Sequence, residues 1–111
     1  MSIETRTVKD VTILDVKGKV TIGEGDVTLR ESIRGALADG AKKILLNLSG
    51  VTTIDSSGIG ELVSSYTTIN YQGGKLKLTN LPPKVNDILM ITQLITVFET
   101  YDSETEALQS F

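Results

Sequence analysis

The chain has 111 residues, of which 40% are hydrophobic and 23% are charged, and its formal net charge at pH 7 is −3. This length and composition fit one soluble domain with its own hydrophobic core. Cysteine and histidine are both absent, which excludes disulfides, thiol chemistry and a Ser–His–Asp triad and removes the usual zinc ligands. The basic residues are scattered, so we expect no direct nucleic-acid partner.

The N-terminal segment Met1–Arg6 lacks the apolar stretch of a signal peptide. No apolar run in the sequence reaches the length needed to span a bilayer. We therefore expect a cytoplasmic protein without a membrane partner.

The first part of the chain predicts a β-hairpin, a helix and a buried strand. The segments 3–8 and 11–16 are rich in β-branched residues, and Gly18 is expected to close the second strand. From about Gly25 to Asp39 the apolar residues recur at helical spacing. The nearly continuous apolar run Lys43–Leu48 is typical of a strand that is covered on both faces.

The middle of the chain predicts a second helix and a half-buried strand. Residues 49–54 form a short connection, and from Ile59 the apolar positions again have helical spacing until Gln72-Gly73-Gly74. Lys75–Thr79 alternates polar and apolar residues, as a strand with one solvated face does. We expect the aromatic residues of this and the following part to lie in the core or at its edge: Tyr66, Tyr71, Phe98 and Tyr101.

The last part predicts a third helix, a strand and a fourth helix. Pro82-Pro83 can open a helix because the first helical N–H groups lack partners. Val97–Tyr101 predicts a strand, and Asp102 or Ser103 is expected to cap the last helix. Ser103 has capping-box spacing to Glu106. Alternating strands and helices after a hairpin predict an α/β fold, with a mixed, mostly parallel sheet of about five strands and about four helices. We expect a single domain over residues 1–111.

The segment Asp55-Ser56-Ser57-Gly58-Ile59-Gly60 stands where a strand is followed by a helix. In parallel α/β sheets this edge is where ligands and partners usually bind. The simplest interpretation is a helix N-cap, because Asp and Ser oxygens accept hydrogen bonds from the first free N–H groups. A cap at one residue is compatible with modification of its neighbour.

The functional hypothesis is phosphorylation of Ser56. A phosphoryl group adds about −1.5 to −2 charges at pH 7, which the positive end of a helix partly offsets. Asp55 acts in the opposite direction, since its carboxylate repels the phosphate. A partner docked over this edge would meet a strongly hydrated dianion, so one phosphate can switch binding off.

The sequence gives little support for nucleotide binding or catalysis. The glycine pairs of Gly23-Glu24-Gly25 and Gly58-Ile59-Gly60 lack the third glycine of a dinucleotide-binding loop. Ser56 has no histidine base and no nucleophile elbow. Asp55 and Glu61 are expected to be solvated acids at a helix start rather than a catalytic pair. We therefore expect no catalytic residue, no metal and no cofactor.

At this point the chain resembles the STAS family of bacterial anti-sigma-factor antagonists over essentially its whole length. The D-S-S-G segment in its strand–helix context, within residues 54–60, carries this resemblance together with three further stretches: 44–51, 73–76, and 97–98 with 101–108. The resemblance implies the STAS fold. It also implies a cycle in which the unphosphorylated antagonist binds an anti-sigma factor that is also a serine kinase and so releases the sigma factor.

In this cycle the kinase phosphorylates the serine directly after the Asp, here Ser56, and the complex weakens. A PP2C-type phosphatase restores the active form. The antagonist is a substrate and a ligand and not an enzyme, since ATP and its metal belong to the kinase. The resemblance places the partner surface at nine residues: Asp55, Ser56, Ser57, Gly58, Ile59, Gly60 and Glu61, with Gly23 and Glu24 beside them.

Three alternatives remain open at this stage. A STAS module can scaffold a larger signalling complex, or it can be a subunit of a lipid or anion transporter. An enzyme that uses Ser56 as its nucleophile is the third. Particle size, a membrane-protein partner and reactivity toward ester substrates, respectively, distinguish these alternatives from a partner-switching antagonist.

Overall fold

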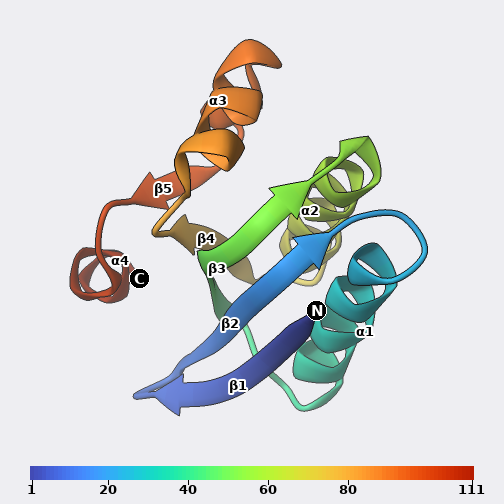
Figure 1. The fold of residues 1–111 in the computed structure, drawn as a ribbon. Helices are drawn as coiled ribbons and strands as arrows, with labels where there is room; N and C mark the ends of the chain where they lie inside the picture. Colours follow the sequence, from blue (N-terminus) through green and yellow to red (C-terminus); the bar gives the residue numbers. More distant parts are fainter.

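The computed structural model describes all residues from Met1 to Phe111 and contains one five-stranded sheet with the strand order β1-β2-β3-β4-β5. β1 pairs with β2 in an antiparallel hairpin, and all other neighbours are parallel. The sheet in Figure 1 is made of β1 (Ser2–Val8), β2 (Val11–Val20), β3 (Lys43–Ile54), β4 (Lys75–Thr79) and β5 (Glu99–Tyr101). This is the predicted mixed, mostly parallel sheet that opens with a hairpin.

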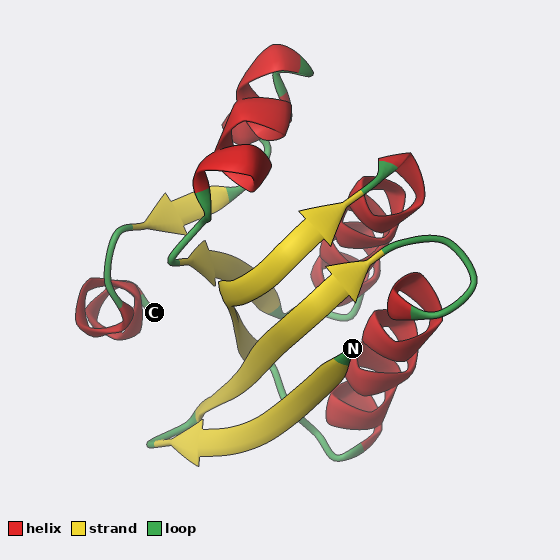
Figure 2. Ribbon diagram, viewed as in Figure 1, coloured by secondary structure: helices red, strands yellow, loops and turns green.

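The helices cover both faces of this sheet (Figure 2). α1 (Gly25–Ala38) and α2 (Ser56–Tyr71) lie side by side on one face, and α4 (Glu104–Ser110) lies on the other. α3 (Pro83–Ile91) and a 3₁₀ turn, η1 (Leu94–Thr96), join β4 to β5. No helix is both long enough and apolar enough to cross a bilayer.

The apolar run of β3 is explained by burial on both sides. Ile44 and Leu46 belong to a cluster of 19 buried residues shared with α1, α2 and α3. Leu45 points the other way, into a smaller cluster with Ala107 of α4. Successive side chains of a strand alternate between the faces, so a strand between two helical layers needs apolar residues throughout.

Two strands are longer than their sequence predicts. β2 continues past Gly18 to Val20, and β3 continues past Leu48 to Ile54. The pairing between them shifts register at two places and still ends with Val20 beside Ile54. The polar and glycine residues that interrupt the apolar pattern lie at these irregular places, where one strand gains a residue without ending the ladder.

β4 has the predicted bounds, but the prediction that it is half-buried is wrong. Lys77 retains only 2% exposure because α4 covers it. Its ammonium donates hydrogen bonds to the carbonyl and hydroxyl oxygens of Ser110, at 2.8 Å and 2.9 Å. The same ammonium lies near the rings of Tyr101 and Phe111. A long cationic side chain can therefore be buried once a helix end and two rings surround its charge.

Differences near the other elements have simple causes. α2 begins at Ser56, before Ile59, because the polar first turn carries no apolar periodicity. β5 begins at Glu99 and not at Val97 as predicted. Val97 directly follows the 3₁₀ turn η1 and keeps a helical conformation. Of the two expected caps, Asp102 and Ser103, it is Ser103 that caps the last helix, by accepting a hydrogen bond from the N–H of Glu106.

The expectation that Tyr66, Tyr71, Phe98 and Tyr101 lie in the core or at its edge is wrong for Tyr71. Tyr66 and Phe98 pack edge to face with centroids 5.5 Å apart. Tyr71 is 92% exposed, although Ile69, two residues earlier, is fully buried. Two residues correspond to about 200° around a helix, so these side chains point in opposite directions.

Candidate functional site

The two long helices begin beside the end of β2, at the carboxyl edge of the sheet (Figure 1). Their first turns approach Val20 so closely that only glycine fits at two positions. A Cβ on Gly25 would lie 2.0 Å from the carbonyl oxygen of Lys19. A Cβ on Gly58 would lie 2.1 Å from the carbonyl oxygen of Val20. These glycines place the starts of α1 and α2 next to each other, which makes one continuous surface from two distant segments.

Asp55 joins the two segments through its carboxylate. One oxygen accepts a hydrogen bond from the N–H of Gly58 at 2.9 Å, which caps α2. The other oxygen accepts from the N–H of Ile22 at 3.0 Å, in the loop that follows β2. The hydrogen bond from Gly58, and to a smaller extent the one from Ile22, holds the pKa of Asp55 below its ordinary value. Asp55 is therefore ionised at neutral pH and links the β2–α1 loop to the start of α2.

Ser56 is the first residue of α2 and is exposed, whereas Ser57 is partly buried. The first N–H groups of a helix lack helical partners and favour negative charge near them. The cap at Asp55 thus coexists with an accessible hydroxyl at the next residue, as the sequence suggests. An added phosphate at Ser56 would project from a surface that no other element of the chain covers.

The β2–α1 loop lies beside this serine, as expected from the resemblance. Gly23 and Glu24 are exposed, and the N–H of Gly23 donates to the carboxylate of Asp26 at 3.0 Å. Gly23 has φ +87°, a conformation that disfavours other residues. The predicted partner residues of the two segments therefore meet at one edge of the sheet.

The predicted partner surface divides into exposed and supporting residues. Ser56, Gly60, Gly23 and Glu24 are exposed. Three others are buried and shape the surface from beneath: Gly58, Ile59 and Glu61. Glu61 is not the solvated acid that its place near a helix start predicts. It is 8% exposed, and its carboxylate pairs with the guanidinium of Arg30 on α1 at 3.4 Å.

The sequence interpretation missed Ile22. This side chain is 73% exposed, although its backbone N–H is bound by Asp55. The available signal was its position between the last strand residue and a glycine, outside any strand or helix period.

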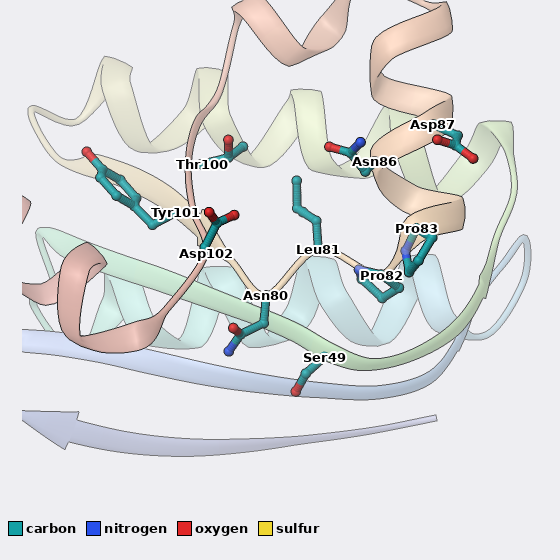
Figure 3. Close-up of a pocket in the computed structure, with 10 residues that line it drawn as sticks. All are labelled: Ser49, Asn80, Leu81, Pro82, Pro83, Asn86, Asp87, Thr100, Tyr101 and Asp102. Atoms are coloured by element: carbon teal, nitrogen blue, oxygen red, sulfur yellow. The ribbon is translucent and has the colours of Figure 1, made fainter.

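The largest cavity lies elsewhere, between the start of α3 and the ends of β4 and β5 (Figure 3). Its volume is about 720 Å³, and only two of its ten lining residues are hydrophobic. Asp87 and Asp102 line it, and no Lys or Arg does. A wall of this charge suits neither phosphate nor nucleotide. Neither Asp55 nor Ser56 lines this cavity. We therefore take the edge around Ser56 as the candidate site.

We predict that Asp55→Asn frees the loop but keeps the helix cap, whereas Asp55→Ala loses both. Asparagine has one acceptor oxygen and is itself a good N-cap. Amide hydrogen exchange should therefore accelerate at Ile22 in both variants but at Gly58 only in the alanine variant. Equal protection of Ile22 in all three proteins would contradict the link.

The pH dependence of this link has a defined sign. Because folding lowers the pKa of Asp55, its stabilising effect is present above the ordinary aspartate pKa and is lost as the pH falls below about 4. The thermal midpoint of Asp55→Ala should be a few degrees below that of the unmodified protein at pH 7. This difference should shrink at pH 3, as followed by circular dichroism.

Comparison with known proteins agrees with this architecture. The STAS domain model matches residues 2–107. The chain is 26% identical over 108 residues to the anti-sigma F factor antagonist of Paenibacillus polymyxa, a match that covers 97% of this chain and 92% of that protein. The chain is 30% identical to a protein of Thermotoga maritima assigned as an anti-sigma factor antagonist, whose crystal structure superimposes with a TM-score of 0.89. This match covers 97% of this chain and 92% of the Thermotoga chain.

The fold is also that of the anti-sigma factor antagonist SpoIIAA of Bacillus, which has been solved in two forms. The unphosphorylated form has 18% identity and a TM-score of 0.73, and the match covers 98% of this chain and 96% of that one. The phosphorylated form has 19% identity and a TM-score of 0.74, and the match covers 98% of both chains. With a family model over nearly its whole length and relatives of the same description, the chain belongs to the STAS domain family of anti-sigma factor antagonists.

Proposed function

We propose that the protein is a phosphorylation-controlled antagonist that binds an anti-sigma factor with serine-kinase activity. It binds in the unphosphorylated form and is released when Ser56 is phosphorylated. The observation that carries this proposal is the exposed serine at the first residue of α2, directly after the Asp55 cap. The name of the Paenibacillus relative, an anti-sigma F factor antagonist, supports the class of partner.

In this proposal the chain supplies a hydroxyl group and a surface, and the kinase supplies the chemistry. The Ser56 oxygen attacks the γ-phosphorus of ATP, a new P–O bond forms and the bond to ADP breaks. The serine proton passes to a base of the kinase. A PP2C-type phosphatase later hydrolyses the phosphoserine and returns the hydroxyl. The antagonist is a substrate and a ligand, not an enzyme.

The site is suited to gain charge without loss of the fold. Ser56 side-chain atoms take part in no hydrogen bond within the chain, so modification breaks none. The positive end of α2 favours the phosphate, while the ionised Asp55 opposes it. SpoIIAA, which shares the fold, has been solved in both phosphorylation states. Both points support a switch that changes the surface rather than the architecture.

The test is phosphorylation by the host's anti-sigma-factor kinase with ATP and Mg²⁺, followed by peptide mass mapping. We expect a single phosphate on Ser56 in the unmodified protein and in Ser57→Ala. Ser56→Ala should remain unmodified. A phosphate found only on Ser57, or on another segment, would falsify the assignment.

A further inference from the structure

We propose that Ile22 is the apolar anchor by which the partner kinase holds this protein, and that it enters a hydrophobic pocket of that kinase. This inference rests on the proposed function, because it names a second contact at the same site. Ile22 provides affinity through burial, and Ser56 provides control through charge. The carboxylate of Asp55 binds the backbone N–H of Ile22 and also caps α2. No other residue with an exposed apolar side chain is bound by this carboxylate.

Exposure of a single apolar side chain is ordinary in soluble proteins and needs no explanation by itself. What sets Ile22 apart is the way in which its backbone is held. Its N–H donates to Asp55 at 3.0 Å, and the next N–H, of Gly23, donates to Asp26 at 3.0 Å. The N–H of Asp26 in turn donates to the carbonyl of Thr21 at 3.1 Å.

This loop is therefore ordered before any partner arrives, with a 73% exposed isoleucine at its surface. Fixing a flexible loop costs binding free energy, and a pre-ordered loop avoids most of that cost. A β-branched side chain also has few rotamers to lose. An apolar side chain contributes strongly to affinity when it fills a well-packed, desolvated pocket of the partner near the centre of the interface.

Ile22 lies so close to the start of α2 that a kinase bound at Ser56 is expected to cover it. Asp55 binds the N–H of Ile22 with one oxygen and the N–H of Gly58 with the other. Ser56 lies between Asp55 and Gly58 in the chain, so Ile22 and Ser56 flank the same carboxylate. A kinase that brings its ATP to the Ser56 oxygen must approach this edge closely and exclude water there.

Two roles follow from the different chemistry of the two side chains. Burying Ile22 strengthens the unphosphorylated complex and is nearly independent of salt. A phosphate on Ser56 keeps its hydration shell and holds the kinase surface away from the neighbouring isoleucine. One modification thereby removes the apolar contact as well as adding charge.

The first experiment measures affinity by isothermal titration, with the host anti-sigma-factor kinase that phosphorylates Ser56 as the probe. Ile22→Ala should weaken binding by about tenfold or more, and Ile22→Val by much less. The matched control is Tyr71→Ala, because Tyr71 is 92% exposed at the far end of α2. That end is about 22 Å from Ser56 at the helical rise, so affinity should change less than about twofold.

The second experiment tests direct burial and uses the absence of native cysteine. Ile22→Cys and Tyr71→Cys are alkylated with iodoacetamide in the presence and absence of the kinase. We expect protection at position 22 and none at position 71. Equal alkylation at both positions with bound kinase would overturn the anchor, as would unchanged affinity of Ile22→Ala.

Failure of this inference is distinguishable from failure of the proposed function. If Ser56 is phosphorylated and the phosphate weakens binding while Ile22→Ala binds normally, only the anchor is wrong. If the unmodified protein neither binds the kinase nor accepts phosphate, the proposed function itself is wrong. Thermal melting of every variant excludes unfolding as the cause, since an exposed side chain contributes little to stability.

Discussion

Phosphorylation of Ser56 is expected to weaken binding to the anti-sigma-factor kinase by about a hundredfold or more. A buried or like-charged phosphate at an interface costs several kcal/mol, and each 1.4 kcal/mol is about tenfold in affinity. Ser56 is exposed at the edge where the partner is proposed to dock, so the added charge falls within the interface. Surface plasmon resonance with purified phosphorylated and unphosphorylated protein measures the change.

Substitutions separate the effect of charge from the effect of the hydroxyl. Ser56→Ala should bind as tightly as the unphosphorylated protein and stay bound in the presence of ATP. Ser56→Asp should bind more weakly, but less so than the phosphoserine, because a carboxylate carries one charge rather than nearly two. The hypothesis fails if phosphoserine at position 56 leaves the affinity within about twofold of the unmodified protein.

Gly58→Ala is expected to lower the free energy of unfolding by about 3 kcal/mol, at the upper end of overpacking effects. The new methyl group would lie 2.1 Å from the carbonyl oxygen of Val20 and 2.7 Å from a side-chain carbon of Ile54. One of these atoms is backbone, which cannot rotate away. The start of α2 must therefore move off the end of β2, and urea unfolding reports the loss.

Gly60 supplies the control for this prediction. It lies in the same helix, and a Cβ there would meet no atom within 4 Å. Gly60→Ala should raise stability by about 0.5–1 kcal/mol, because alanine favours helices over glycine. If the two alanine variants had the same urea midpoint, close packing at Gly58 would not explain its place in the sequence.

The movement of α2 in Gly58→Ala should also separate the start of α2 from the β2–α1 loop. Asp55 is held between Gly58 and Ile22, so a displaced helix start stretches one of these hydrogen bonds. Hydrogen exchange at Ile22 should then accelerate in Gly58→Ala but not in Gly60→Ala. This result would link the packing of glycine to the geometry of the partner surface.

Most of the fold could be predicted from local patterns. Helical spacing from about Gly25 to Asp39 located α1. The chain leaves this helix at Gly40, whose φ of +91° suits glycine. The continuous apolar run of β3 indicated a strand covered on both faces, and the alternation of strands and helices indicated a parallel sheet. These features depend on residues close in sequence, so they are visible without tertiary contacts.

The errors occurred where distant contacts outweigh local pattern. The interrupted end of β3 remains a strand because β2 pairs with it as far as Ile54. Lys77 is buried because Ser110 at the end of α4 supplies acceptors and Phe111 directly after it supplies a ring. Glu61 is buried because α1 presents Arg30 to it. None of these partners is near in sequence.

A serine directly after a capping aspartate at the start of a helix can be recognised in the sequence alone, and on this basis we propose Ser56 as the phosphorylation site. Helix caps and apolar periods are local properties, so a single segment contains them. Three features could be seen only in the folded chain: the N–H of Ile22 binds the carboxylate that caps α2, Glu61 is buried beneath the surface, and particular side chains remain exposed. Such contacts depend on how strands and helices pack, because chain folding brings residues 22 and 55 together across 33 positions.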